Sequence, residues 1–159
     1  MDEEAALKKA RYLVLRLLTY RARSRKEVEE YLERKGFSDQ LSESVIKEME
    51  KYGYIDDERF AKDFTSYRKL RGFGLKKIRY ELYLKGIDSQ IIDQTIDEQF
   101  DPEDDKSRIK EILEKRNHNK LTEDQRDERW FRREAAFLQR RGFQDNLIMA
   151  ALKEYDHSE

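Results

Sequence analysis

The first third of the chain carries apolar residues at the three- and four-residue spacing of amphipathic helices. The spacing predicts three helices, over residues 3–21, 25–35 and 39–52. Ser24 with Glu27 forms a capping box before the second helix, and Ser38 is a suitable N-cap for the third. Gly36 and Gly53 suit the left-handed conformation that ends many helices. Amphipathic helices so closely connected imply one small shared core.

The same plan recurs in the middle of the chain. Three more helices are predicted, over residues 57–71, 75–85 and 89–100. Gly72 and Gly86 are suited to end the first two, and Asp88 takes the place of Ser38 before the last. The apolar positions predict a core made of Phe60, Phe64, Tyr67, Ile78, Leu82, Ile91, Ile92 and Ile96.

The last third opens with the dipeptide Asp101-Pro102, an N-cap followed by proline at the first helical position. A polar stretch over residues 116–122 then predicts a connection longer than its counterparts. Thr122 with Gln125 predicts the cap of a helix that runs to Arg141. This part departs most from the plan of the first two.

A short phrase containing a basic residue and glycine occurs three times, as Lys35-Gly36-Phe37, Lys85-Gly86-Ile87 and Arg141-Gly142-Phe143. The spacing of about fifty residues indicates internal repeats. We therefore expect an all-α fold of three tandem three-helix repeats. The expected repeats are residues 1–55, 56–100 and 101–159. Such an array presents a long surface rather than a pocket, which favours binding of a large partner over catalysis.

Charged residues make up 43% of the chain, but the net charge is only −1. The two signs are unevenly placed, because residues 8–26 contain no Asp or Glu and residues 88–105 contain no Lys or Arg. Basic residues recur near the junction of the first and second helices of each repeat. In the third repeat these are Arg126, Arg129, Arg132 and Arg133.

The basic junctions of the first two repeats provide the candidate contact residues. These are Arg21, Arg23, Arg25, Lys26, Arg68, Lys69, Arg71, Lys76, Lys77 and Arg79. A basic face of this kind suits the phosphates of a nucleic acid or an acidic groove of a protein. The alternative is that neighbouring residues of opposite charge simply neutralise these side chains.

The sequence contains no convincing catalytic or metal-binding arrangement. His118 and His157 lack partners that would suggest catalysis. The carboxylates that follow Asp101 resemble the start of a calcium loop, but Lys106 replaces the glycine that such a loop requires. The carboxylates of residues 56–58 are interpreted as a helix N-terminus rather than a metal cluster. We therefore assign no catalytic residue, metal or cofactor, and we expect that the protein is not an enzyme.

Two further features bear on function and location. Trp130 and Phe131 could stack on bases, although packing against a neighbouring repeat is the preferred interpretation. The absence of cysteine excludes disulfides, iron–sulfur clusters and thiolate zinc sites. The acidic start and the short apolar run over residues 13–18 predict neither a secretory signal nor a membrane span. We expect a cytoplasmic protein.

A longer stretch of the chain resembles the central signature of the RecX family. It runs from Gly53-Tyr54-Ile55-Asp56-Asp57-Glu58-Arg59-Phe60-Ala61 to Arg68, Gly72, Gly74, Ile78, Glu81, Leu82 and Gly86. The first repeat is similar to the opening repeat of that family at Leu17, Ser24, Glu27, Leu32, Gly36 and Phe37. By this resemblance, the signature residues Tyr54, Phe60, Ile78, Leu82 and Gly86 are expected to hold the fold, as buried apolar and turn positions.

The resemblance implies a bacterial, non-enzymatic regulator of the RecA recombinase, whose three repeats pack into an elongated, curved body. Members of the family lodge in the helical groove of the RecA filament on single-stranded DNA and restrain filament growth, strand exchange and ATP hydrolysis. The expected partners are therefore the RecA filament, the single-stranded DNA within it and, more weakly, free DNA. We expect a monomer that binds no membrane.

Two alternatives of different classes stay open. One is a direct DNA-binding protein whose helices enter a groove in the manner of a helix-turn-helix motif. The other is an adaptor for a different acidic partner that shares only the fold with the RecA regulators. Base-specific binding at physiological salt would favour the first, and the absence of any effect on RecA would favour the second.

Overall fold

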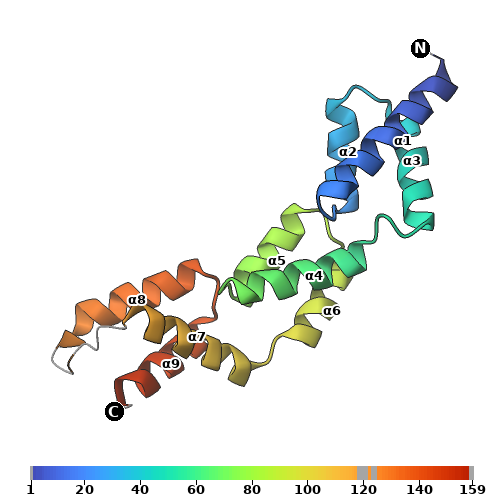
Figure 1. Cartoon of the computed structure of the whole chain (residues 1–159). Helices are drawn as coiled ribbons and strands as arrows, with labels where there is room; N and C mark the ends of the chain where they lie inside the picture. The colour runs from blue at the N-terminus through green and yellow to red at the C-terminus, as the bar shows by residue number, and fades with distance from the viewer. Residues whose placement is uncertain (1, 118–121, 123–124, 158–159) are drawn as a thin grey trace. The chain divides into compact units, whose positions relative to one another are not determined.

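The computed structural model of the chain describes residues 2–117, 122 and 125–157. This described part folds into nine α-helices and contains no β-strand, which confirms the predicted all-α class (Figure 1). The helices are α1 (Glu3–Tyr20), α2 (Arg25–Arg34), α3 (Asp39–Lys51), α4 (Asp57–Leu70), α5 (Leu75–Leu84), α6 (Ser89–Gln99), α7 (Pro102–Arg116), α8 (Glu128–Arg140) and α9 (Asp145–His157). None of the helices among these residues combines the length and the apolar character needed to cross a bilayer.

The local signals in the sequence place most helix ends correctly. The Ser24 hydroxyl accepts a hydrogen bond from the Glu27 backbone N–H, and the Glu27 side chain accepts one from the Ser24 N–H, which completes the capping box. Ser38 caps α3 and Asp101 caps α7. Gly36 adopts a positive φ of 87° after α2, as the C-terminal turn requires.

Two details of the predicted helices were wrong. The helix expected to follow Thr122 begins instead at Glu128, because the Asp127 carboxylate caps it by accepting the Trp130 N–H at 2.9 Å. The Thr122 N–H does reach Gln125 Oε1 at 2.9 Å, but this contact closes a turn ahead of the helix. Tyr67, expected in the core, has 55% of its surface exposed on α4.

The helices pack into two compact units. The first consists of Met1–Phe64 and Leu82–Ile92, and the second consists of Thr65–Glu81 and Asp93–Glu159. Parts of α4, α5 and α6 therefore belong to each unit. The predicted repeat boundaries after residues 55 and 100 are not tested by this division and stay a prediction.

The core of the first unit lies between α1, α2 and α3 (Figure 1). Its fully or almost fully buried side chains are Ala10, Val14, Val28, Leu32, Val45, Ile46, Met49 and Ile55. They come from the apolar stripe of each helix, as the periodicity predicted. Burying a side chain of this size stabilises a fold by about 1.5–3 kcal/mol.

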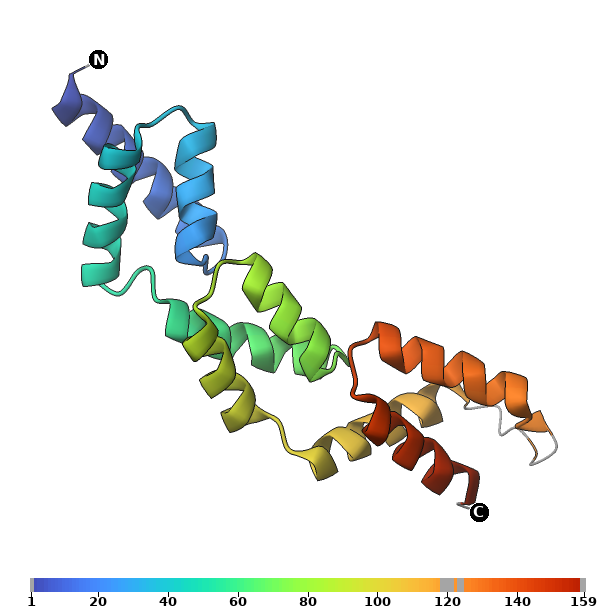
Figure 2. The same cartoon turned by 180° about the vertical axis from the view of Figure 1, so that it is seen from behind.

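The core of the second unit lies between α7, α8 and α9 (Figure 2). Trp130 is 1% exposed and stacks on Tyr155 with 5.9 Å between ring centroids. Its indole N–H donates to Asn117 Oδ1 at 3.0 Å, so the polar atom of this buried ring is satisfied. Trp130 is therefore a packing residue, but among the described residues it packs within its own three helices and not, as was expected, against a neighbouring repeat.

The signature residues hold the fold with one exception. Phe60, Ile78 and Leu82 are at most 6% exposed, and Gly86 adopts a positive φ of 76°. Tyr54 is 58% exposed, which contradicts its expected role as a buried residue. The ring of Tyr54 is therefore available at the surface of the α3–α4 connection.

Two of the three basic-glycine phrases make a close contact, one within each unit. In the first unit, the Lys85 carbonyl accepts a hydrogen bond from Ser24 Oγ at 2.7 Å. In the second unit, the Arg141 carbonyl accepts from the Gly74 N–H at 2.8 Å, and the Gly142 carbonyl accepts from the Lys76 N–H at 2.9 Å. Each turn thus packs on the start of an earlier second helix.

The glycine of each of these two turns leaves no room for a side chain of its own. A Cβ atom on Gly86 would lie 2.5 Å from Lys26 Cβ, and one on Gly142 would lie 2.5 Å from the Lys77 backbone N. Gly36 is the glycine of the first such phrase, but a Cβ atom added to it would meet nothing within 4 Å. The glycines at the two contacts are therefore required by space as well as by φ.

An ion-pair cluster fastens α9 to α7 and should affect acid stability. Glu154 on α9 contacts both Lys106, at 2.8 Å, and Lys110 on α7. Hydrogen bonds from Lys106 and Lys110 lower the pKa of Glu154 from 4.5 to about 2. Because the folded pKa lies below the ordinary value, the stabilisation is complete above about pH 4.5 and is lost as the pH falls toward 2.

We expect Glu154→Gln to flatten the acid limb of stability. The decrease in Tm between about pH 5 and pH 2 should be smaller than in the unmodified chain, because the variant has no carboxylate to protonate at this position. Thermal unfolding followed by circular dichroism over this pH range measures the effect. Glu111→Gln, which removes an exposed carboxylate of α7 outside the cluster, is the control. Equal slopes for the two variants would contradict the prediction.

Candidate nucleic-acid interface

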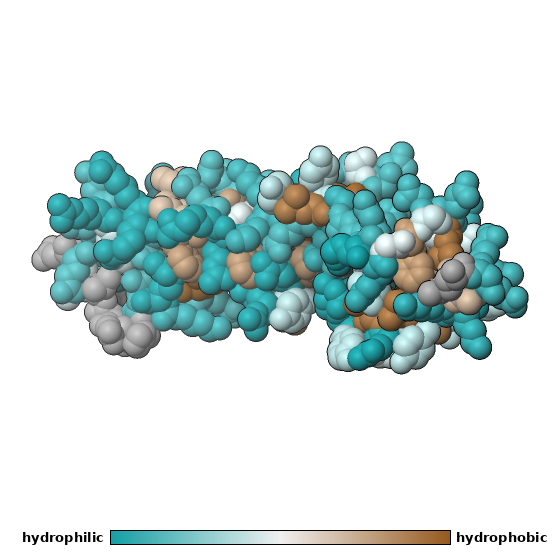
Figure 3. All heavy atoms as spheres, turned by 90° about the horizontal axis from the view of Figure 1, so that it is seen from above, coloured by the Kyte–Doolittle hydropathy of each residue, from teal (hydrophilic) through white to brown (hydrophobic). Residues whose placement is uncertain are grey.

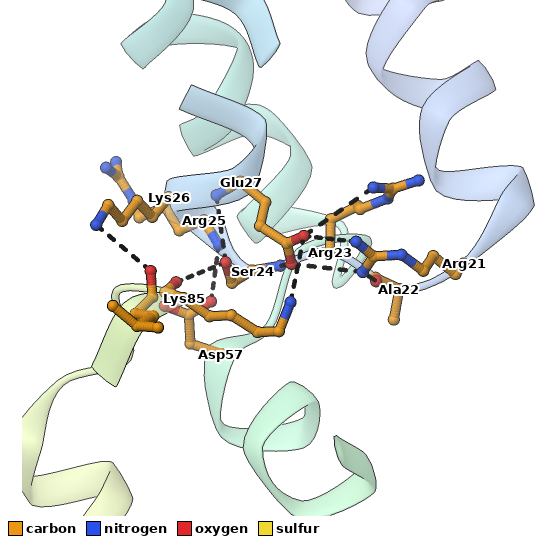
Figure 4. A network of polar contacts seen from close by, with 10 residues as sticks. Arg21, Ala22, Arg23, Ser24, Arg25, Lys26, Glu27, Asp57 and Lys85 are labelled. Carbon is orange, nitrogen blue, oxygen red and sulfur yellow. Dashed lines mark hydrogen bonds and ion pairs between the residues drawn. The ribbon is translucent and has the colours of Figure 1, made fainter. Parts of the chain in front are cut away.

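Four of the candidate residues lie where α1 ends and α2 begins, in the first unit. Arg21, Arg23, Arg25 and Lys26 surround the Ser24 cap (Figure 4). The capping box fixes the backbone here, so the four side chains leave from a defined turn. Figure 4 shows that most of them point toward carboxylate or carbonyl oxygens rather than away from the chain.

Arg25 is held by carboxylates from two helices. Its guanidinium contacts Glu29 on α2, and it reaches Glu43 at 2.5 Å and Glu50 at 3.1 Å on α3. The hydrogen bond with Glu43 is the largest influence, and it raises the pKa of Arg25 above its ordinary value. The charge of Arg25 is thus neutralised within the unit, where it joins α2 to α3.

Glu27 is the centre of the remaining contacts. Its carboxylate lies 2.6 Å from Arg21, 4.0 Å from Arg23 and 3.7 Å from Lys85. Burial by itself raises the pKa of Glu27, but the hydrogen bonds from Arg21 and the Ser24 N–H, with nearby Lys85, outweigh burial and hold the pKa below its ordinary value. Glu27 therefore stays ionised and offsets part of the basic charge.

Arg21 and Lys26 retain the most exposure in this group. Their side chains are 47% and 46% exposed, whereas that of Arg23 is 21% exposed. Burial lowers the pKa of Arg23, and its Nε has no hydrogen-bond partner within the described part of the chain. The ammonium of Lys26 is only loosely held, 3.5 Å from the Leu84 carbonyl and 3.9 Å from Glu30. Arg21 and Lys26 are the members best placed to meet a partner.

The other six candidates lie in the second unit, and two of them, Arg68 and Lys69, are mostly buried and held by internal contacts. Arg68 donates to Glu81 at 2.9 Å and lies over the Phe73 ring, 3.8 Å from its centroid. Lys69 donates to the Gln99 carbonyl and lies 3.6 Å from Asp104. Both side chains are at most 20% exposed, so their charges interact mainly with carboxylates of the same unit.

The remaining four candidates differ in their exposure and in their internal contacts. Arg79 forms an ion pair with Asp93 at 2.6 Å, and Lys77 lies over the Phe73 ring at 4.9 Å from its centroid. Arg71 is exposed and lies 5.8 Å from the Tyr67 ring centroid.

Lys76 is exposed near the start of α5, and among the described residues no carboxylate lies within ion-pair distance of it. Arg71 and Lys76 are thus the most available cations of this group.

The alternative explanation was that neighbouring carboxylates neutralise the basic side chains, and the structure shows which candidates have such neighbours. Arg25, Arg68 and Lys69 are neutralised as that alternative describes, whereas Arg71 and Lys76 are not. Sequence reasoning missed Arg141, whose guanidinium lies 4.6 Å from the Phe73 centroid and donates to the Arg71 carbonyl at 3.2 Å. The recurrence of the basic-glycine phrase was the available signal for it. Whether the ten candidates contact a partner stays a prediction.

The carboxylate cluster at residues 56–58 behaves as a helix start. Asp56 accepts a hydrogen bond from the Arg59 N–H at 3.1 Å, and Asp57 accepts one from the Arg25 N–H at 2.9 Å. Among the described residues, no three His, Cys, Asp or Glu side chains are grouped so that they could hold a metal ion. His118 lies outside the described residues, and His157 ends α9.

Hydrophilic residues cover most of the face seen in Figure 3, and hydrophobic ones form small separate patches.

Two sequence-family models match the helices that carry the candidates: the first three-helix domain of RecX matches residues 10–49, and the second matches residues 56–96. The chain belongs to the RecX family. The two RecX matches end before α7, so the helices of the last third lie outside them.

Curated relatives agree with the RecX assignment, and a solved structure agrees with the fold. A protein of Mycolicibacterium vanbaalenii named regulatory protein RecX is 34% identical over 87% of this chain and 77% of its own length. The protein of the same name from Oceanobacillus iheyensis is 29% identical over 100% of this chain, which spans 58% of that relative. The crystal structure of RecX from Lactobacillus salivarius has a TM-score of 0.78 at 21% identity, over 96% of this chain and 98% of that one.

Proposed function

We propose that this chain regulates a RecA recombinase by binding in the helical groove of the RecA filament on single-stranded DNA. In this proposal it inhibits filament growth, strand exchange and ATP hydrolysis, and it does so by binding rather than by catalysis. It acts as a cytoplasmic monomer. Membership of the RecX family, a family of regulatory proteins, is the observation that carries the proposal.

The distribution of available cations supports this function. Arg21 and Lys26 in the first unit, and Arg71 and Lys76 in the second, keep exposed charge near helix junctions. Two groups of cations on one chain can contact DNA phosphates or acidic surfaces at two places at once. Linked contacts of this kind raise the affinity well above that of either contact alone.

The test is ATP hydrolysis by a RecA protein on single-stranded DNA, titrated with the full chain at two salt concentrations. We expect inhibition when the chain is present at a small fraction of the RecA concentration, because blocking growth at a few sites affects many protomers. Inhibition should weaken with salt, since phosphate contacts release counterions.

Two other outcomes would separate the alternatives. No inhibition by folded protein, together with base-specific binding of DNA without RecA, would replace the proposal with direct DNA binding. No inhibition and no DNA binding would favour an adaptor for another partner. Circular dichroism on the same sample confirms that the protein used is folded.

A further inference from the structure

The solvent face of α1 carries cations and tyrosines in alternation. Lys8, Tyr12, Arg16 and Tyr20 follow one another at intervals of four residues, which places them along one side of the helix. All four are exposed, and Tyr12 and Tyr20 have 62% and 73% of their surface accessible. The opposite side of α1 holds Ala10 and Val14 in the core against α2 and α3 (Figure 1).

The cations of this face form no ion pair with the described part of the chain. Within the described residues, no carboxylate lies within ion-pair distance of Lys8, Arg16 or the neighbouring Lys9. This differs from Arg11 on the same helix, which is paired with Glu48 at 3.0 Å. Glu4 precedes Lys8 by four residues and limits the positive face at its N-terminal end.

The rings of Tyr12 and Tyr20 are not packed against a core, unlike those of two other tyrosines of the chain. Tyr31 is half-buried against the core of the first unit, and Tyr155 stacks on Trp130. Tyr12 and Tyr20 instead present most of their rings to solvent between the cations. A row of exposed rings between unpaired cations suits a ligand that combines flat apolar faces with negative charge.

Single-stranded nucleic acid has that combination, because its phosphates are negative and its bases expose flat aromatic faces. We propose that the α1 face formed by Lys8, Tyr12, Arg16 and Tyr20 is a binding site for single-stranded nucleic acid. Lys8 and Arg16 contact phosphates, and Tyr12 and Tyr20 stack on bases. No acceptor for specific base edges is needed, so the site does not select a sequence.

The dimensions of the face fit a short strand. Residues 8–20 span about 18 Å at a rise of about 1.5 Å per residue. At about 3.4 Å for each stacked nucleotide this length accommodates about five nucleotides. An apolar groove of a protein would instead require a continuous aliphatic surface, and Leu15, at 38% exposed, is the large aliphatic side chain that this face offers.

The inference is independent of the proposed regulation of RecA, because the site is made from residues outside the ten candidates and is assayed without RecA. Loss of the α1 site leaves the proposed function standing, and failure of the RecA assay leaves the α1 site standing.

The experiment measures binding of a fluorescein-labelled oligothymidylate of about 20 nucleotides to the full chain by fluorescence anisotropy at low salt. The test variant is Tyr12→Ala with Tyr20→Ala. The control is Tyr52→Ala with Tyr54→Ala, a pair of tyrosines that are 63% and 58% exposed at the α3–α4 connection. The two double variants remove the same side chains at similar exposure from different surfaces of the first unit.

We expect the Tyr12 and Tyr20 variant to bind at least about 25-fold more weakly, or about fivefold per lost stacking contact, and the control to bind as the unmodified chain does. A second variant, Lys8→Ala with Arg16→Ala, should reduce the log–log dependence of affinity on salt by about 1.4, since each contacted phosphate of a single strand contributes about 0.7. Alanine is the best helix-forming residue, so α1 should persist in both variants, and circular dichroism verifies this.

Three results would overturn the site. They are an unmodified chain that does not bind the oligonucleotide, α1 variants that bind as tightly as the unmodified chain, and a control pair that loses as much affinity as the α1 pair. Loss of RecA inhibition by the α1 variants with unchanged oligonucleotide binding would assign this face to a protein partner, which also contradicts the proposal.

Discussion

Gly142→Ala is expected to lower the free energy of unfolding of the second unit by about 2–5 kcal/mol. Two penalties add. A non-glycine residue at the φ of 93° observed for Gly142 costs about 1–2 kcal/mol. The new Cβ would also lie 2.5 Å from the backbone N of Lys77, and forcing a methyl group into a closed contact costs about 1–3 kcal/mol more. The hydrogen bond from the Lys76 N–H to the Gly142 carbonyl, 2.9 Å in length, would be strained as well.

Gly72→Ala is the matched control because it tests φ without the close contact. Gly72 belongs to the same unit and has a φ of 86°, but the nearest atom to its added Cβ is Ile112 Cδ1 at 3.6 Å, an ordinary van der Waals distance. We expect this variant to lose only about 1–2 kcal/mol. Equal losses in the two variants would show that the packed turn does not restrict residue 142.

The single tryptophan makes the comparison specific to the second unit. Trp130 is buried between the helices of that unit, so its fluorescence in a urea titration reports the unfolding of these helices. Circular dichroism followed in parallel reports both units. A change in the fluorescence midpoint that exceeds the change in the ellipticity midpoint would place the destabilisation in the second unit, as expected.

Arg71→Glu combined with Lys76→Glu is expected to raise the concentration for half-inhibition of RecA ATP hydrolysis by about 100-fold. A hydrogen bond to a charged group contributes about 1.5–3 kcal/mol, which corresponds to tenfold or more for each contact. The two residues were chosen because their charges are exposed, whereas Arg68 and Lys69 are held by internal partners. This prediction rests on the proposed function.

Both substitutions are compatible with the fold. Lys76 lies in the first turn of α5, where a carboxylate is favourable next to the unpaired N–H groups of the helix. Lys51→Glu with Lys153→Glu, which reverses two exposed lysines of α3 and α9, is the control for net charge. If both double variants inhibited equally well, the contact surface would have to lie elsewhere on the chain.

Most helix boundaries could be predicted because their signals are local. The capping box at Ser24, the proline after Asp101 and the glycines that end helices act within a few residues of the chain, so the sequence displays both partners of each interaction. The start of α8 was missed because Thr122 and Asp127 are both residue types that cap helices. The structure has the cap at Asp127, whose carboxylate accepts the N–H of the buried Trp130.

The candidate contact residues were less predictable from the sequence. Charge placement located the basic junctions, but it did not show that Glu43 and Glu50 of α3 would surround Arg25, or that Glu81 would face Arg68. The exposure of Tyr54 and Tyr67 was equally hidden, because an aromatic residue at helical spacing is compatible with either face at the edge of a stripe. Such outcomes depend on which helices become neighbours.

The sequence by itself determined the all-α class, the recurrence of the basic-glycine phrase and membership of the RecX family, since periodicity, caps and family signatures are properties of residue order. Only the tertiary structure decided which candidate cations lack an internal ion pair among the described residues and why a Cβ on Gly142 would approach Lys77 too closely. Arg25 and Glu43, and likewise Gly142 and Lys77, are far apart along the chain, and their separation in space is fixed by helix packing. Electrostatic energies and steric contacts depend on that distance in space.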